Sequence, residues 1–349
     1  MALYNAFTIL IVLSAIFGFI NYKYLKLPAT IGVMIISIIS SLVLVALGNL
    51  YPSLIQNAKE TVEGIDFSSI LMRVMLSFLL FAGAIQLDAK KLADEKLPII
   101  VFSILGVIIS TFIVGASMYY LLKLFTIEVD FIYCLLFGAL ISPTDPIAVI
   151  GILRKANIPK PLEVRITGES LFNDGVAVVL FLTIFEIAEI GIDKLSFGNT
   201  AFLFLKEVGG GIVFGFILGY TGYLALKTIN NYKVEVIITL ALVMGGYSIA
   251  RSMHISGPLS MVVAGIIIGN KGKKFAMSDI TRANLESFWE IIDELLNIIL
   301  FILIGFELLI ITFQSSFVKL GIIAIFIVLL ARFISVGFSI QLLKYKINF

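Results

Sequence analysis

The sequence predicts an all-α polytopic membrane protein, and its composition and its hydropathy pattern both indicate this fold class. Of the 349 residues, 60% are hydrophobic and 14% are charged, whereas a soluble domain has about 25% charged residues. The mean hydropathy is +1.10, and the apolar residues form runs of about 20, the length of a membrane-spanning helix. A water-soluble fold cannot bury this much apolar surface, so lipid must be the solvent for most of the chain.

Eleven apolar runs are predicted to span the membrane. They cover about residues 4–21, 28–48, 67–87, 98–122, 131–153, 164–189, 201–226, 233–250, 257–270, 287–311 and 318–343. Three segments between them, 51–66, 88–97 and 271–286, are polar and are predicted to be loops. The first run lacks the basic start and the cleavage pattern of a signal peptide, so it is expected to remain as a helix.

The lysines and arginines predict the orientation of these spans. Seventeen of them lie in alternate connections and at the C-terminal end, whereas five lie in the opposite set. Cytoplasmic loops carry the excess of basic residues, which places the N-terminus outside and the C-terminus of this chain in the cytoplasm of a multi-pass cell-membrane protein. The net charge of +2 predicts no nucleic-acid partner.

A weak internal repeat predicts two halves of opposite orientation. FLLFAGAIQLD at 78–88 resembles LFILIGFELLI at 300–310, and Gly83 aligns with Gly305. An offset of seven spans inverts the second copy, as in many secondary transporters. We therefore expect one transmembrane domain over 1–349, with an N-terminal repeat at about 1–190, a linker span at about 200–226 and a partial inverted repeat at about 232–349. The counterparts of spans five and six would begin after Phe349, which predicts a C-terminally incomplete repeat.

The fifth span is predicted to be a discontinuous helix around 142–146. Pro143 and Pro146 flank Thr144 and Asp145 in the middle of an apolar run. Each proline removes a backbone donor and clashes with the preceding turn, and freed backbone groups are tolerated in a membrane only where protein surrounds them. A simple proline kink is the alternative, but it leaves the carboxylate between the prolines unexplained.

The sixth span carries a polar stripe. Glu169, Ser170, Asn173 and Asp174 fall on one face of a helix. Ionisable groups inside a span usually mark ion paths or proton relays. The alternative is that the span begins later and the stripe lies in headgroup water, but the apolar residues after Gly175 are too few to cross the membrane alone.

These side chains predict a site for a monovalent cation. Asp174, Asn173, Ser170 and Thr144 offer oxygen ligands, which suit a hard cation, and no Cys or His accompanies them. A cation requires the deprotonated carboxylate, so its binding to Asp174 expels a proton. Asp174, Ser170 and Thr144 are the predicted cation ligands, and no cofactor is expected.

Arg332 is a second charge predicted to lie inside the membrane, near the middle of the last span. Its guanidinium cannot lose its proton, so it needs an acidic partner. Glu169 and Glu307 are the candidates. Glu169 is preferred because that pairing leaves Asp174 for the ion.

Two of these segments resemble a known family. SPTDPIAVIGIL and GESLFNDGVAVVLF, within 138–181, closely resemble the sodium/proton exchangers of the NhaP and NHE type, monovalent cation–proton antiporters with an Asn-Asp pair. The resemblance implies a homodimer whose protomers each have a core and a dimerisation domain and move like an elevator. It implies that Asp174 carries the ion, helped by Asn173, Ser170 and Thr144, and that Glu169 and Arg332 form a structural ion pair. It places Asp145 at a crossing of broken helices, where it balances helix-end charge, and it suggests electroneutral exchange.

The chain departs from the family pattern in two respects. Ala82 stands where members often have an acidic residue, and the family normally has about two more spans. The expected function is nevertheless exchange of Na⁺, or else Li⁺ or K⁺, for H⁺ by a transporter that is not an enzyme, with membrane lipid and a second copy as partners. The alternatives are another secondary carrier, which would need basic ligands at the midplane, and an intramembrane aspartyl protease built on Asp145 and Asp174.

Overall fold

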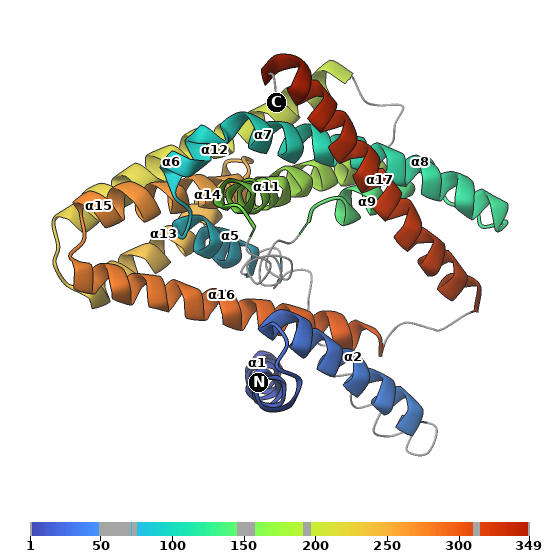
Figure 1. Cartoon of the computed structure of the whole chain (residues 1–349), viewed down its shortest axis with the longest axis horizontal. Coiled ribbons are helices and arrows are strands. Elements are labelled where there is room, and N and C mark those ends of the chain that lie inside the picture. The colour runs from blue at the N-terminus through green and yellow to red at the C-terminus, as the bar shows by residue number, and fades with distance from the viewer. Residues whose placement is uncertain are drawn as a thin grey trace.

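The computed structural model describes residues 2–48, 71, 75–144, 158–190, 197–309 and 315–347. All regular structure within these ranges is helical (Figure 1). The first half contains α1 (Ala2–Ile20), the π-helical turn η1 (Asn21–Leu25), α2 (Ala29–Gly48), α5 (Leu76–Ile85), α6 (Ala89–Asp94), α7 (Lys96–Ile100), the π-helical turn η3 (Val101–Gly106), α8 (Val107–Leu124), α9 (Phe131–Ile141) and α11 (Lys160–Ile190). The second half contains α12 (Phe197–Lys227), α13 (Tyr232–Ser252), α14 (Gly257–Ile267), the π-helical turn η5 (Ile268–Gly272), α15 (Lys273–Phe275), α16 (Asp279–Glu307) and α17 (Ser315–Ile347).

Each of the eleven predicted spans overlaps at least one of these helices. Seven described helical segments are long and apolar enough to cross a membrane, and α5 and α9 are shorter apolar helices. The predicted break in the fifth span begins where α9 ends, because residues 142–144 are not helical. Asp145 and Pro146, like the predicted loop at 51–66, lie outside the described residues.

Two segments predicted to be loops are largely helical. Residues 88–97 form α6 and the start of α7, because the Asp88 carboxylate caps α6 and accepts hydrogen bonds from the backbone N–H groups of Lys90 and Lys91 at 2.9 and 3.3 Å. Within 271–286, α16 begins at Asp279, where Ser278 caps it. The polar residues suggested a loop, but the first turns of α16 form an amphipathic helix, in which Leu285 is buried while Arg282 and Asn284 are exposed.

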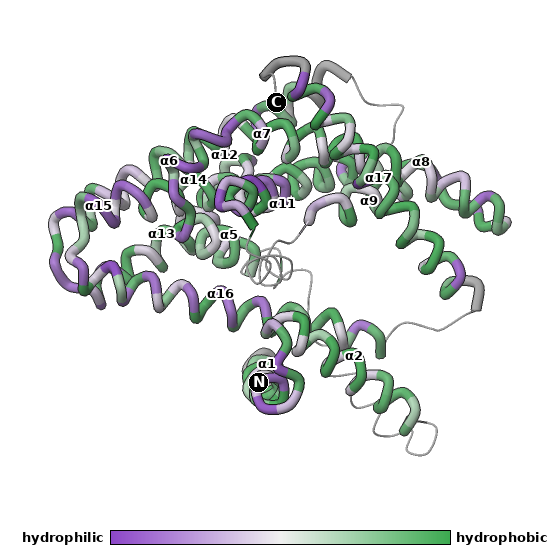
Figure 2. The backbone as a smooth tube through the Cα atoms, in the orientation of Figure 1, coloured by the Kyte–Doolittle hydropathy of each residue, from purple (hydrophilic) through white to green (hydrophobic). Residues whose placement is uncertain are grey.

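The helices pack as groups around separate apolar clusters (Figure 1). One cluster joins α5, α12, α13, α14 and α16 around Phe81, Met261 and Trp289. A second joins α1 and α2 to the later turns of α16, and a third joins α8, α9 and α17. Helix α11 contacts α9 and η3 on one side and α14 and α12 on the other. Figure 2 shows α11 in the middle of the molecule, and its polar stripe therefore lies on a helix that contacts more than one of these groups.

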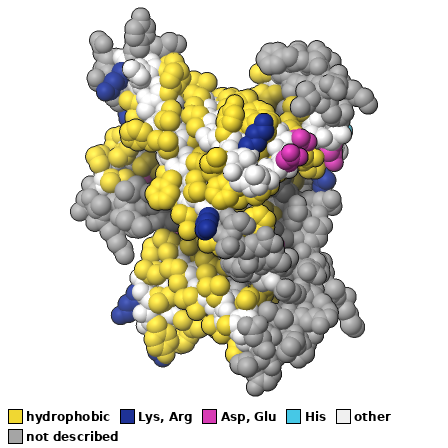
Figure 3. Space-filling model, turned by 90° about the vertical axis from the view of Figure 1, so that its right-hand side faces the viewer, with side chains coloured by type: hydrophobic (Ala, Val, Ile, Leu, Met, Phe, Trp, Pro, Cys, Tyr) yellow, Lys and Arg dark blue, Asp and Glu magenta, His cyan; other side chains and the backbone are white. Residues whose placement is uncertain are grey.

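Apolar side chains cover much of the outer surface, as expected of a protein embedded in lipid. On α17, Phe326 and Phe333 are 68% and 78% exposed. Figure 3 shows one face of the molecule on which yellow apolar side chains predominate and charged side chains are few. Lipid tails are the environment in which such a surface is stable.

A charged cluster outside the membrane spans anchors the end of α5 and gives a pH-dependent prediction. The buried ammonium group of Lys273 donates a hydrogen bond to the Ile85 carbonyl at 2.9 Å and lies 2.8 Å from the Glu286 carboxylate. Partial burial acts to raise the pKa of Glu286, but the hydrogen bonds and charges of Lys273 and Arg282 outweigh it and hold the pKa below its ordinary value of 4.5. The stabilisation is therefore present above pH 4.5 and is lost as the pH falls through the lowered value.

Lys273→Met is expected to remove most of this loss of stability at acid pH, because the Glu286 carboxylate then has no buried cation that favours its charged form. Melting temperature measured across the acid range in detergent checks it, with the exposed neighbour Lys274→Met as the matched control. An acid profile that is the same for Lys273→Met and wild type would contradict the assignment.

Candidate ion-binding site

The polar stripe of α11 is attached to the non-helical segment that follows α9. The Ser170 hydroxyl donates a short hydrogen bond to the Thr144 carbonyl, and the Asn173 amide Nδ2 donates to Thr144 Oγ1 at 3.1 Å. Ser170 and Asn173 can both reach Thr144 because residues three apart share a helix face. The carbonyl that the end of α9 leaves without a helical partner is thus satisfied by α11, as a break inside a membrane requires.

Arg332 of α17 joins the same cluster. Its Nη2 donates to Glu169 Oε1 at 2.6 Å and to Thr144 Oγ1 at 3.3 Å. Asn173 Nδ2 also donates to Glu169 Oε1, at 2.8 Å. The Arg332 and Glu169 side chains are 24% and 11% exposed, so the pair is largely removed from water. The structure thus brings together Thr144, Glu169, Ser170, Asn173 and Arg332 from three separate parts of the chain.

These hydrogen bonds determine which candidate ligands still have an oxygen lone pair that could bind a cation. A hydroxyl oxygen accepts two hydrogen bonds, and Thr144 Oγ1 already accepts from Asn173 and Arg332. In this conformation Thr144 therefore orients its neighbours, and it could hold a cation only after one donor leaves. Asn173 Oδ1, by contrast, is buried and has no hydrogen-bond partner among the described residues. A buried acceptor without a donor is costly, and this one adjoins the half-buried Asp174.

Several hydroxyl groups that sequence reasoning missed support the cluster. Ser103 Oγ donates to the Glu169 carbonyl at 3.1 Å, and Ser335 Oγ donates to the Gly106 carbonyl at 2.8 Å. Thr111 Oγ1 donates to Ser142 Oγ at 3.3 Å. All four hydroxyl side chains are buried. Their presence in apolar spans was a usable signal, but the sequence does not show which helices they face.

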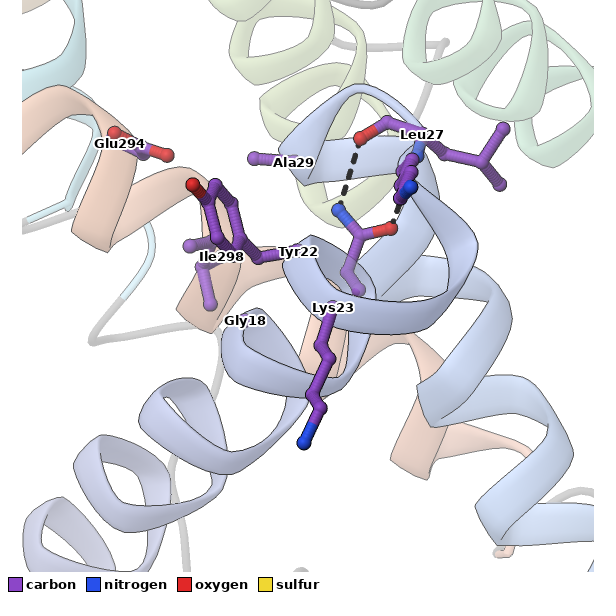
Figure 4. Close-up of a pocket in the computed structure, with 9 residues that line it drawn as sticks. Gly18, Tyr22, Lys23, Leu27, Ala29, Glu294 and Ile298 are labelled. Carbon is purple, nitrogen blue, oxygen red and sulfur yellow. Dashed lines mark hydrogen bonds between the residues drawn. The ribbon is translucent and has the colours of Figure 1, made fainter.

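A separate cavity lies away from this cluster. It has a volume of about 770 Å³ and lies between the turn after α1 and the helix α16, where Lys23, Lys26 and Glu294 line it (Figure 4). Asn21 closes the turn: its Nδ2 donates to the Leu27 carbonyl at 3.0 Å, and its Oδ1 accepts from the Leu27 N–H at 3.4 Å. None of the predicted ion-site residues lines this cavity.

The close contact of α8 and α9 positions the non-helical segment and allows a test by substitution. A Cβ atom at Gly138 would lie 2.3 Å from the Thr111 carbonyl oxygen, a backbone atom. Gly138→Ala is therefore expected to push α9 away from α8, to destabilise the protein by about 1–3 kcal/mol and to weaken apparent cation affinity through Ser142 and Thr144. Thermal melting and the cation concentration at half-maximal transport check it. Gly337→Ala is the control, because nothing lies within 4 Å of the added atom, and equal behaviour of the two variants would refute the prediction.

Comparison with known proteins agrees with this architecture. A family model described as "Sodium/hydrogen exchanger, transmembrane" matches residues 9–349. The chain is 48% identical over 335 residues to the Na⁺/H⁺ antiporter NhaP of Pseudomonas aeruginosa, an alignment that covers 96% of this chain and 79% of that protein. It is 32% identical over 289 residues to the Na⁺/H⁺ antiporter NhaH of Halobacillus aidingensis, covering 82% of this chain and 69% of the relative.

The fold also matches a solved structure. The sodium proton antiporter MjNhaP1 from Methanocaldococcus jannaschii, determined at pH 8, superposes with a TM-score of 0.76 over 100% of this chain and 80% of that chain, at 19% identity. At that identity the match establishes the antiporter fold and no more. Together with the family model and the relatives, it shows that the chain belongs to the sodium/hydrogen exchanger family.

Proposed function

We propose that this chain exchanges a monovalent cation, with Na⁺ the foremost candidate, for protons across the membrane by alternating access. The observation that carries the proposal is the cluster of Thr144, Glu169, Ser170, Asn173 and Arg332 around a helix break beside Asp174. The relatives from Pseudomonas aeruginosa and Halobacillus aidingensis are named Na⁺/H⁺ antiporters, which supports the same chemistry here.

We assign the transported ion or proton to Asp174. Asn173 Oδ1 is a buried oxygen that still lacks a donor among the described residues, so it is the second ligand. Ser170 and Thr144 complete the oxygen set, Thr144 only after Asn173 or Arg332 releases its hydroxyl. Proton and cation compete for the same carboxylate, so the site holds one or the other, and exchange results if the site crosses the membrane only when it is loaded. Electroneutral one-for-one exchange follows if Asp174 is the single titrating group.

The remaining residues hold this site in shape. Glu169 and Arg332 form the ion pair that joins α11 to α17. Asp145, between Pro143 and Pro146, would balance the partial charges at the ends of broken helices. With Glu169 as its partner, Arg332 does not supply the basic ligand that a carrier of organic anions needs.

The topology and assembly complete the proposal. The excess of basic residues in alternate connections supports a cell-membrane protein with its N-terminus outside and the C-terminus of this chain in the cytoplasm. Inverted repeats at about 1–190 and 232–349, linked by α12, would let one helix group move relative to the other in an elevator-like step. We expect a homodimer in which the second copy holds the stationary group.

Everted membrane vesicles test the proposed function. With an acidic interior imposed, addition of Na⁺, Li⁺ or K⁺ is expected to make the interior more alkaline in vesicles that carry the protein, but not in vesicles from the same strain without it. The cation that gives the half-maximal response at the lowest concentration is the preferred substrate. If none of the three cations moves protons while the protein is folded in the membrane, cation–proton exchange is rejected.

A further inference from the structure

A second carboxyl group is buried far along the chain from the proposed ion site. Glu235 lies in the first turn of α13 and is 0% exposed. Its Oε1 accepts a long hydrogen bond from Thr281 Oγ1 of α16 at 3.4 Å, and the backbone of Asn231 also lies close to the carboxyl. Its Oε2 is buried and has no hydrogen-bond partner among the described residues. Around it, Val236, Leu285 and Trp289 belong to one apolar cluster.

In the described part of the chain, no cation neutralises this carboxyl. The basic groups near this end of α13 have other contacts: Lys273 and Arg282 pair with Glu286, Lys271 lies over the Tyr220 ring, and Lys233 of α13 itself lies over the Tyr232 ring. Lys206 of α12 and Arg251 of α13 are exposed. Lys227, Asp279 and Glu290 are exposed and Glu286 is half-buried, and α5 and α14 carry no charged residue. A buried carboxylate without a partner is so costly that such a group normally holds a proton instead.

A chain of hydroxyl groups connects Glu235 to the protein surface. Ser278 is exposed at the start of α16. Its hydroxyl donates to Thr281 Oγ1 at 3.2 Å, and the Thr281 hydroxyl donates to the Glu235 carboxyl. All donors point inward, so a proton can be passed from one hydroxyl to the next. Each hydroxyl takes up a proton as it gives one away, and water at Ser278 supplies the first.

We propose that Glu235 is a second proton-binding carboxyl, distinct from the exchange site around Asp174 and loaded through Ser278 and Thr281. In its protonated form Glu235 accepts the hydrogen bond from Thr281 and keeps the contact between α13 and α16 uncharged and free of water. Loss of the proton places a charge in that contact. The site binds a proton, not a metal ion, because among the described residues one hydroxyl oxygen, that of Thr281, bonds to the carboxyl, whereas a metal ion needs a set of oxygens.

The protein contains its own reporter for this proton. Trp289 is the single tryptophan of the chain. Its indole Nε1–H donates to Thr239 Oγ1 at 3.1 Å, and Thr239 lies one turn after Glu235 on α13. A charge that appears on Glu235 changes the field at the buried indole ring and draws water into the contact, so it should change the fluorescence of Trp289.

The experiment follows Trp289 emission of the whole protein in lipid nanodiscs as the pH is raised from about 4.3, the ordinary value for a glutamate. The wild type is expected to show one transition in this titration, and Glu235→Gln is expected to lack it. Thr281→Val removes the donor that favours the charged form, so it should move the midpoint upward by about one pH unit. Glu290→Gln, which alters an exposed carboxyl next to Trp289 on α16, is the matched control and should retain the wild-type transition.

Three results would overturn the proposal: no transition in the wild type, a transition that persists in Glu235→Gln, or an unshifted midpoint in Thr281→Val. The last variant keeps the test decisive if Glu235→Gln does not fold. Addition of Na⁺ or K⁺ at constant pH should leave the emission unchanged, and a saturable cation response that is lost in Glu235→Gln would make the site a metal site instead. Asp174→Asn should retain the transition, which separates this site from the exchange site.

Discussion

Asp174→Ala is expected to abolish cation-driven proton movement in everted vesicles. The carboxylate is the group in the proposed site that can hold either a proton or a cation, so its removal takes away both substrates at once. A hydrogen bond or contact to a charged group contributes about 1.5–3 kcal/mol, and the lost affinity alone is therefore about 10- to 100-fold. The initial rate of interior alkalinisation after a Na⁺ pulse is the measurement, and it should fall to the level of vesicles without the protein.

Two further variants separate the role of the charge from that of packing. Asp174→Asn keeps the shape of the side chain but cannot ionise, so it should be as inactive as Asp174→Ala while it melts near the wild-type temperature. Glu189→Gln alters an exposed carboxyl on the same helix and should transport normally. Full exchange by Asp174→Asn would show that this carboxylate does not carry the ion.

Much of the fold could be predicted because lipid imposes strong rules on sequence. A run of about 20 apolar residues and the alternation of basic residues predicted eleven spans, and α1, α2, α11, α13 and α17 lie close to their predicted ranges, as do α7, η3 and α8 taken together. Polar connections follow weaker rules. The segment at 271–286 has a charged composition that suits a loop, but Ser278 caps a helix there and Trp289 fastens its buried side to Thr239. Contacts between spans are not encoded in hydropathy, so the helical start of α16 could not be foreseen.

The site could be predicted in part, because its residues are expensive in a membrane. The cost of burying Glu169, Asp174 and Arg332 singled them out, and the geometry brings Arg332 to Glu169. The supporting hydroxyl groups of Ser103, Thr111 and Ser335 carry no such cost, since a serine or threonine in a helix can bond its own backbone. Ala82 stands where family members often have an acidic residue, and it lies fully buried in α5 beside Phe81. A carboxyl group at this position would need a polar or basic partner, which the surrounding apolar cluster does not supply.

Glu169→Gln is expected to destabilise the protein more than Arg332→Met, although each removes half of the same ion pair. Breaking a buried pair costs about 3–5 kcal/mol, because the remaining charge is left without compensation. A carboxyl stranded by Arg332→Met can take up a proton, and Asn173 still donates to it. The guanidinium stranded by Glu169→Gln cannot lose its charge, and among its described hydrogen bonds it keeps only neutral acceptors, Thr144 Oγ1 and the amide oxygen that replaces the carboxylate.

The double variant completes the argument, because it removes both charges. Glu169→Gln combined with Arg332→Met should be more stable than Glu169→Gln alone, with a coupling of about 0.5–3 kcal/mol in a double-mutant cycle. Melting temperatures of the four proteins in one detergent measure it. Additive losses would mean that the pair contributes packing alone. If the double variant recovers stability and still fails to transport, Arg332 and Glu169 have a second effect, which is to place Thr144 and Asn173 beside Asp174. The Asn173 amide bonds to Glu169 and the Thr144 hydroxyl bonds to Arg332, so the double variant removes both of these contacts.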